Sequence, residues 1–120
     1  MRVAVLGASP NRERYSNQAV RLLDQFGHEV IPVNPGHAEI EGLAAVSSLD
    51  ALEPGSVDTL TMYVGPERSA AMGPSILRLA PARVIFNPGS ENPELAGELE
   101  AAGIEVLEAC TLVMLRAGQF

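Results

Sequence analysis

The stretch Val3-Ala4-Val5-Leu6-Gly7-Ala8-Ser9-Pro10-Asn11 says more about the fold than any other part of the sequence. Its first four residues form a short, continuous apolar run, which is typical of a strand buried on both faces of a parallel sheet. Gly7 ends this run, and the residues after it are typical of a loop. A helix is predicted at 16–27, with Ser16 as its N-terminal cap and Gly27 as its terminator. The chain therefore opens with a strand, a loop and a helix.

The same alternation continues to the end of the sequence. Short apolar runs predict four more strands, at 29–33, 57–64, 83–86 and 104–107. A helix is predicted at 93–102, and the helix after Gly65 is expected to break at Gly73 and Pro74. Alternating strands and helices favour right-handed crossovers and a parallel sheet with both faces covered. We predict one α/β domain over residues 1–120, a doubly wound, Rossmann-like fold with five parallel strands and helices on both faces.

The composition limits the kinds of partner. All eight basic residues are arginines against 15 acidic ones, so the net charge is −7. A basic face for nucleic acid or for an anionic membrane is therefore not expected. An anionic ligand would have to be bound by these few arginines or by backbone N–H groups. No metal site is predicted.

Cysteine usage and apolar runs bear on location. Cys110 is the only cysteine, which excludes an intramolecular disulfide and a Cys-based zinc site and suits the cytoplasm. The apolar run near the N-terminus is far shorter than a signal-peptide core or a membrane span. The tail 111–120 begins with an apolar segment, which could form an extra strand or a contact surface for a homodimer.

The loop 7–16 is the place where an anion is expected. Backbone N–H groups of a strand-to-helix turn and the helix dipole favour negative charge there, and Arg12 and Arg14 add formal charge. The small residues Gly7 and Ala8 would let a phosphate approach the backbone. The alternative is a tight turn with two solvated arginines.

Three common site types are disfavoured. The pattern G-x-G-x-x-G fails because Ser9 and Arg12 stand where glycines are needed, and Asn34 replaces the acidic residue of an NAD site. A P-loop needs a lysine, and this chain has none. A phosphoacceptor site needs an aspartate where Tyr63 stands. The sequence therefore lacks the residue patterns that hydride transfer and phosphoryl transfer need.

A family resemblance rests on two segments of the first half. Residues 5–11 with 14–17, followed by Ile31-Pro32-Val33-Asn34-Pro35, resemble the small bacterial CoA-binding domain proteins, which are similar to the CoA-binding domain of the succinyl-CoA synthetase alpha subunit standing alone. Cys110 matches a cysteine usual in that family. The resemblance covers almost the whole chain and implies CoA or acyl-CoA as ligand.

The resemblance also implies roles for particular residues. The phosphates would be surrounded by Gly7, Ala8, Ser9, Arg12, Arg14, Tyr15 and Ser16. The adenosine end would lie beside Asn34 and Pro35, the adenine beside Tyr63, Val64, Gly65 and Pro66, and the pantetheine along Asn87, Pro88 and Gly89. Relatives often carry a lysine after the Asn-Pro pair, suited to the ribose 3′-phosphate, and here Gly36 and His37 follow.

No catalytic residue is predicted, and the expected function is binding of CoA, acyl-CoA or an adenine nucleotide without catalysis. Two alternatives stay open. The first is an acyl- or thiol-exchange enzyme that uses Cys110 or His37. The second is an interaction domain that has lost its ligand and dimerises through its tail. His28, at the start of a strand, is expected to be structural.

Overall fold

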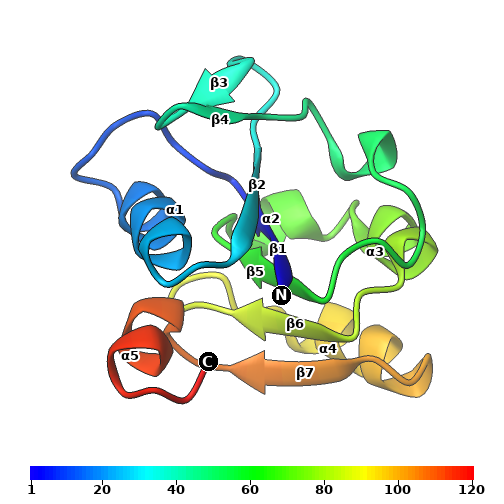
Figure 1. Cartoon of the computed structure of the whole chain (residues 1–120). Helices are drawn as coiled ribbons and strands as arrows, with labels where there is room; N and C mark the ends of the chain where they lie inside the picture. Colours follow the sequence, from blue (N-terminus) through cyan, green and yellow to red (C-terminus); the bar gives the residue numbers. More distant parts are fainter.

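The computed structural model describes all residues 1–120, and its centre is a five-stranded parallel sheet (Figure 1). Its strands are β1 (Arg2–Leu6), β2 (Glu29–Val33), β5 (Thr59–Met62), β6 (Arg83–Phe86) and β7 (Glu105–Glu108). The spatial order is β2-β1-β5-β6-β7, and every neighbouring pair is parallel. The predicted doubly wound sheet is therefore confirmed.

The strand order reverses between β1 and β5. The chain moves outward from β1 to β2, and then returns past β1 to add β5 on its other side. The loops that leave β1 and β5 consequently diverge to opposite faces of the sheet, which leaves a crevice at their carboxyl ends. Any ligand site of this fold is expected there.

Helices cover both faces of the sheet, as predicted (Figure 1). The helices are α1 (Tyr15–Gln25), α2 (Pro66–Ser69), α3 (Gly73–Leu79), α4 (Pro93–Ala101) and α5 (Thr111–Arg116). On one face α1 packs against α5, and on the other α3 packs against α4. The predicted break at Gly73 is confirmed, since α2 and α3 are separate helices.

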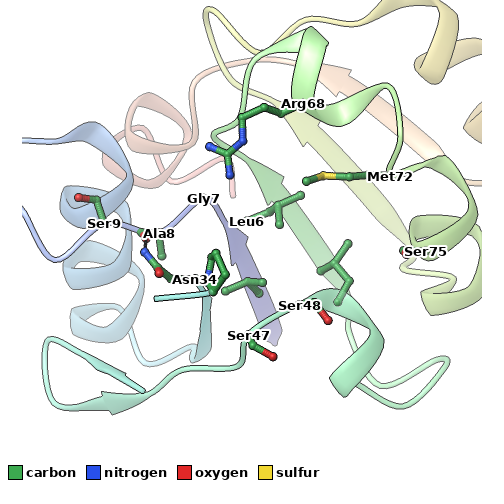
Figure 2. A pocket seen from close by; sticks show the side chains of 13 residues that line it. Leu6, Gly7, Ala8, Ser9, Asn34, Ser47, Ser48, Arg68, Met72 and Ser75 are labelled. Atoms are coloured by element: carbon green, nitrogen blue, oxygen red, sulfur yellow. Dashed lines mark hydrogen bonds between the residues drawn. The ribbon is translucent and has the colours of Figure 1, made fainter. Parts of the chain in front are cut away.

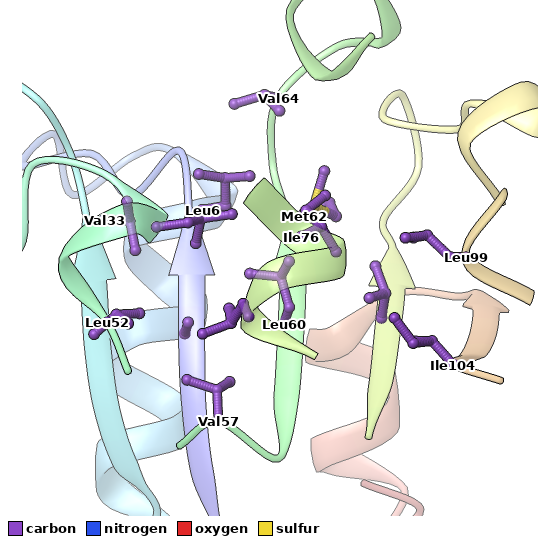
Figure 3. Packing of buried hydrophobic residues seen from close by; sticks show 14 of the residues in the cluster. Leu6, Val33, Leu52, Val57, Leu60, Met62, Val64, Ile76, Leu99 and Ile104 are labelled. Carbon is purple, nitrogen blue, oxygen red and sulfur yellow. The ribbon is translucent and has the colours of Figure 1, made fainter. Parts of the chain in front are cut away.

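The apolar run of β1 explains why both faces need cover. Val3 and Val5 belong to the buried cluster under α1 and α5, whereas Ala4 and Leu6 belong to the larger cluster under α3 and α4. Successive strand residues point to opposite faces, so a strand buried on both sides must be apolar throughout. Figure 3 shows the larger cluster, in which Ile76 of α3 lies over β5.

Two predicted details are wrong. Helix α1 begins at Tyr15 with Arg14 as its N-cap, so Ser16 lies buried in the first turn and is not the cap. The tail forms the helix α5 and not an extra strand, because Leu112 and Leu115 lie at helical spacing and are buried within the chain. Val113 of this helix is 60% exposed.

The segment between β2 and β5 contains elements that the sequence did not predict. A hairpin joins β3 (Glu39–Ile40) to β4 (Leu43–Ala44), and the 3-10 helix η1 (Leu49–Ala51) follows. Glu41 adopts a positive φ of 51° in the hairpin turn. None of the helices combines the length and the apolar character needed to cross a membrane.

Candidate functional site

Two adjoining cavities open at the carboxyl edge of the sheet, in the crevice beside β1 and β5. The first has a volume of about 280 Å³ and the second of about 420 Å³. Gly7, Ser9 and Arg68 line both of them, so the two cavities meet at these residues. Figure 2 shows the first cavity, with Arg68 projecting from α2 towards the turn at Gly7. The place is the one that the strand order predicts.

Gly7 shapes the turn between β1 and α1 in two ways. Its φ is +86°, a conformation that L side chains rarely adopt. A methyl group on it would also lie 2.9 Å from the Tyr63 carbonyl oxygen and 2.9 Å from Val64 Cγ1. Glycine therefore allows the turn after β1 to pass close to the loop after β5, and this close approach brings the two cavities together.

Not all backbone N–H groups of this turn face the cavities. Those of Gly7 and Ala8 donate to the Val33 carbonyl oxygen at 3.2 and 3.3 Å. The N–H groups of Ser9, Tyr15 and Ser16 donate to no group of the protein. The N–H group of Arg12 has no partner either, but Arg12 lines neither cavity, so the amides that can bind an anion in the cavities are those of Ser9, Tyr15 and Ser16.

The start of α1 favours negative charge. Its N-cap Arg14 makes no capping hydrogen bond through its side chain, and the first turn contains no acidic residue. No acidic side chain of the first turn therefore compensates the positive end of the helix dipole. Tyr15 and Ser16, the first two residues of the helix, both line the second cavity.

Asparagine side chains hold the loops in place. Asn34 donates to the Ala8 carbonyl oxygen at 2.8 Å and accepts from the Gly36 N–H, which ties the loop after β2 to the turn after β1. Asn17, which is fully buried in α1, donates to the Ser9 carbonyl oxygen at 2.9 Å. The loop that would carry phosphates is thus fixed before any ligand arrives.

The charge around the cavities is unlike that of the rest of the chain. No acidic residue lines either cavity, although the chain has 15 of them. Arg14 and Arg68 are both exposed, and their guanidinium groups make no ion pair or hydrogen bond within the protein. Two unpaired cations in a cavity without carboxylates form a site for an anion.

Two of the predicted ligand residues lie outside the cavities. Arg12 lines neither of them, and its Nε lies 3.6 Å from the carboxylate of Glu41 in the hairpin turn. Glu41 also accepts a hydrogen bond from Asn17 at 3.1 Å. His37 is exposed in the loop after β2 and lines neither cavity.

Asn87 also lies outside the cavities, because its side chain is used within the fold. It is 2% exposed, donates to Thr61 Oγ1 and to the Met62 carbonyl oxygen, and accepts from the Thr111 N–H. These bonds connect β5, β6 and the start of α5. Pro88 and Gly89, which follow it, line the second cavity.

Tyr63 places a buried hydroxyl beside this network. The hydroxyls of Thr61 and Thr111 bond to each other at 2.7 Å, and the Tyr63 hydroxyl has no partner. Burial, the main cause, raises the pKa of Tyr63 to about 12. Burial therefore favours the neutral form of the Tyr63 hydroxyl. Cys110, the N-cap of α5, is half-buried and lines neither cavity.

The remaining predicted residues divide between the cavities. The first cavity is lined by Gly7, Ala8, Ser9, Asn34 and Pro35, and the second by Gly7, Ser9, Arg14, Tyr15, Ser16, Tyr63, Val64, Gly65, Pro88 and Gly89. The residues expected beside the adenosine end and those expected beside the adenine thus lie in different cavities. Pro66 lines neither one and is the first residue of α2.

Several lining residues were not predicted. They are Leu6, Val33, Ser47, Ser48, Leu49, Arg68, Met72, Ser75 and Ser90. The serines and Met72 leave no pattern in the sequence that separates them from ordinary loop or helix residues. Arg68 had a signal, because it is one of only eight basic residues and follows Gly65 by three positions.

The fold and the cavities together define a doubly wound α/β domain with a candidate ligand site at the switch point of its sheet. The chain belongs to the CoA-binding domain family, whose sequence model matches residues 1–116. The family resemblance inferred from the sequence is therefore confirmed.

Two uncharacterized proteins are similar to this chain over most of its length. The uncharacterized protein YneT of Bacillus subtilis (strain 168) is 29% identical over 106 residues, which are 88% of this chain and 78% of that protein. The crystal structure of an uncharacterized protein is 43% identical, with a TM-score of 0.92 and coverage of 99% of this chain and 97% of that one.

A more distant structure shares the fold alone. It is the dinucleotide forming acetyl-coenzyme A synthetase 1 of Ca. Korarchaeum cryptofilum, solved in complex with phosphate and ADP. It is 23% identical with a TM-score of 0.77, and the match covers 90% of this chain and 25% of that one. The fold therefore also occurs as one part of a much longer chain.

Proposed function

We propose that the protein binds CoA or an acyl-CoA, or a smaller adenine nucleotide, and catalyses no reaction on it. The observation that carries the proposal is the pair of joined cavities at the switch point, lined by two unpaired arginines and by no carboxylate in a chain of net charge −7. Membership of the CoA-binding domain family supports CoA as the ligand class.

The proposed pose follows the chemistry of the cavities. The first cavity combines apolar walls such as Leu6, Val33 and Met72 with serine hydroxyls, which suits the adenosine end. The phosphates lie on the loop 7–16, where the N–H groups of Ser9 and Tyr15 have no protein partner. The pantetheine arm follows the second cavity.

The absence of catalysis is proposed from where the reactive groups lie. Cys110 and His37, the two candidates for acyl or thiol exchange, lie outside both cavities. Labelling of Cys110 with a thiol reagent tests this, because a thiol that reacts with bound ligand must be shielded by it. We expect the same labelling rate with and without saturating acetyl-CoA, whose sulfur is acylated and does not consume the reagent. Strong protection by acetyl-CoA would favour an exchange enzyme.

Binding itself is tested by titration calorimetry with CoA, acetyl-CoA, 3′-dephospho-CoA, ADP and NAD, after native mass spectrometry of the purified protein. Replacing Arg14 with alanine should weaken binding by about 1.5–3 kcal/mol if its contact with phosphate is charge-assisted. Arg116→Ala is the matched control, because Arg116 is exposed on α5 and lines no cavity. An Arg14→Ala protein that binds CoA as well as this control does would remove Arg14 from the site.

Location and assembly belong to the same proposal. We place the protein in the cytoplasm, where a chain with a single cysteine needs no disulfide.

A homodimer through the tail 111–120 would have Val113 at its centre, since Leu112 and Leu115 are already buried. Sedimentation of the wild type and of a Val113→Lys variant tests the dimer. Equal masses for the two would exclude this contact.

A further inference from the structure

Arg68 occupies the junction of the two cavities. It is one of three residues that line both, and it is the only charged one among them. It extends from the short helix α2, is exposed, and makes no ion pair or hydrogen bond within the protein. In Figure 2 its guanidinium group points across the opening towards the turn at Gly7. A ligand that fills both cavities must pass between Arg68 and this turn.

The backbone at the junction offers few donors to such a ligand. The N–H groups of Gly7 and Ala8 are already bonded to the Val33 carbonyl oxygen, so that of Ser9 is the only one left from the turn at this point. Arg12, the nearest other cation along the loop, pairs with Glu41. A side chain must therefore supply the positive charge that the turn's amides do not, and Arg68 is in place to do so.

The group that crosses the junction must connect the two ends of the ligand. In CoA and 3′-dephospho-CoA the 5′-diphosphate joins the adenosine to the pantetheine arm, and ADP carries the same diphosphate at its end. The 3′-phosphate of CoA is a side branch that connects nothing. A planar guanidinium group with five N–H donors can bind two phosphate oxygens at once. The position and the chemistry of Arg68 thus both fit the diphosphate.

We propose that Arg68 binds the 5′-diphosphate where the ligand passes from the first cavity into the second. The ligand class that follows is adenosine 5′-diphosphate and its esters. This inference rests on the proposed function, since it concerns the same site. In addition to the loop 7–16, Arg68 on α2 would then determine specificity. The part of the ligand that it recognises is the 5′-diphosphate, which CoA shares with ADP.

The test measures the dissociation constants of ADP, 3′-dephospho-CoA and CoA for the wild type, Arg68→Ala and Arg68→Lys by calorimetry. Arg116→Ala again serves as control, because it removes the same charge at an exposed position outside the cavities. We expect Arg68→Ala to weaken all three ligands equally, by about tenfold or more, and Arg68→Lys to recover part of the loss. The melting temperature should stay at the wild-type value because the exposed side chain has no hydrogen bond or ion pair to lose.

The outcomes separate this inference from the proposed function. A loss confined to CoA, with dephospho-CoA and ADP unaffected, would overturn the inference, because Arg68 would then bind the 3′-phosphate. An Arg68→Ala protein that binds all three ligands like Arg116→Ala would overturn it as well, while leaving the proposed function intact. A wild-type protein that binds none of the three would refute the proposed function itself, and the inference with it.

Discussion

Replacing Gly7 with alanine should damage the fold and the site together. The residue has a φ of +86°, and an added methyl group would meet the Tyr63 carbonyl oxygen and Val64 Cγ1, both at 2.9 Å. The first of these atoms belongs to the backbone next to β5 and cannot rotate away. The loop after β5 and the turn after β1 must therefore move apart, which opens the junction between the two cavities.

The magnitude has two parts. Holding an alanine at positive φ costs about 1 kcal/mol. Forcing a methyl group into a packed contact costs about 1–3 kcal/mol more. Gly103 allows the first part to be measured alone, because it has the same φ of +86° and nothing lies within 4 Å of where its methyl group would be. We expect a loss of about 2–4 kcal/mol for Gly7→Ala and of about 1 kcal/mol for Gly103→Ala.

Urea denaturation followed by circular dichroism measures both free energies of unfolding. Calorimetry with CoA on the same proteins adds the effect on the site, which should be large for Gly7→Ala and absent for Gly103→Ala. Equal destabilisation by the two substitutions would refute the reasoning, since it would mean that the close approach of Gly7 to the loop after β5 contributes nothing.

Three further predictions concern buried and charged groups. Burial, followed by the positive charges of the Met1 amino group and Arg83, lowers the pKa of His28, so the native state binds this proton more weakly than the unfolded chain does. The free energy of unfolding should therefore be unaffected by this group above about pH 6.5 and should decrease below that pH. In His28→Gln, urea denaturation should show a smaller decrease over the same pH range. Asn87→Ala should cost about 3 kcal/mol in the same assay, because it breaks three buried hydrogen bonds; a loss below about 1 kcal/mol would contradict this. Tyr63→Phe removes a buried hydroxyl without a partner, so thermal unfolding should show equal or higher stability, and a clear loss would reveal a bond that the structure lacks.

The parts of the fold that could be predicted are those with a local signal. Strands β1, β2 and β6 are apolar runs that a glycine or an asparagine ends, and the boundaries 29–33 and 83–86 were predicted to the residue. The hairpin of β3 and β4 gave no such signal, because strands of two residues are too short to show alternation. The helix α5 was missed because six residues contain fewer than two helical turns.

The position of the candidate site could be predicted from the sequence, whereas the groups that are free to bind a ligand there could be predicted only in part. Sheet topology brings the loops after β1, β2, β5 and β6 to one edge, and this follows from the order of elements alone. The Gly7 and Ala8 N–H groups donate to Val33, which lies on a strand far along the sequence. Arg12 pairs with Glu41, which lies in a hairpin that was not predicted. Neither contact can be inferred from the residues next to these positions. Arg68 belongs to the same group, since only the folded chain brings it opposite Gly7.

The central claim is that CoA binds at the carboxyl edge with its phosphates on the loop 7–16, and amide chemical shifts of ¹⁵N-labelled protein test it most directly. Titration with CoA should give saturable shifts that are largest at Ser9, Tyr15 and Ser16, with smaller ones at Gly65 and Gly89. Amides at the opposite edge of the sheet should not move. Shifts confined to that opposite edge, or no shifts at millimolar CoA, would contradict the account.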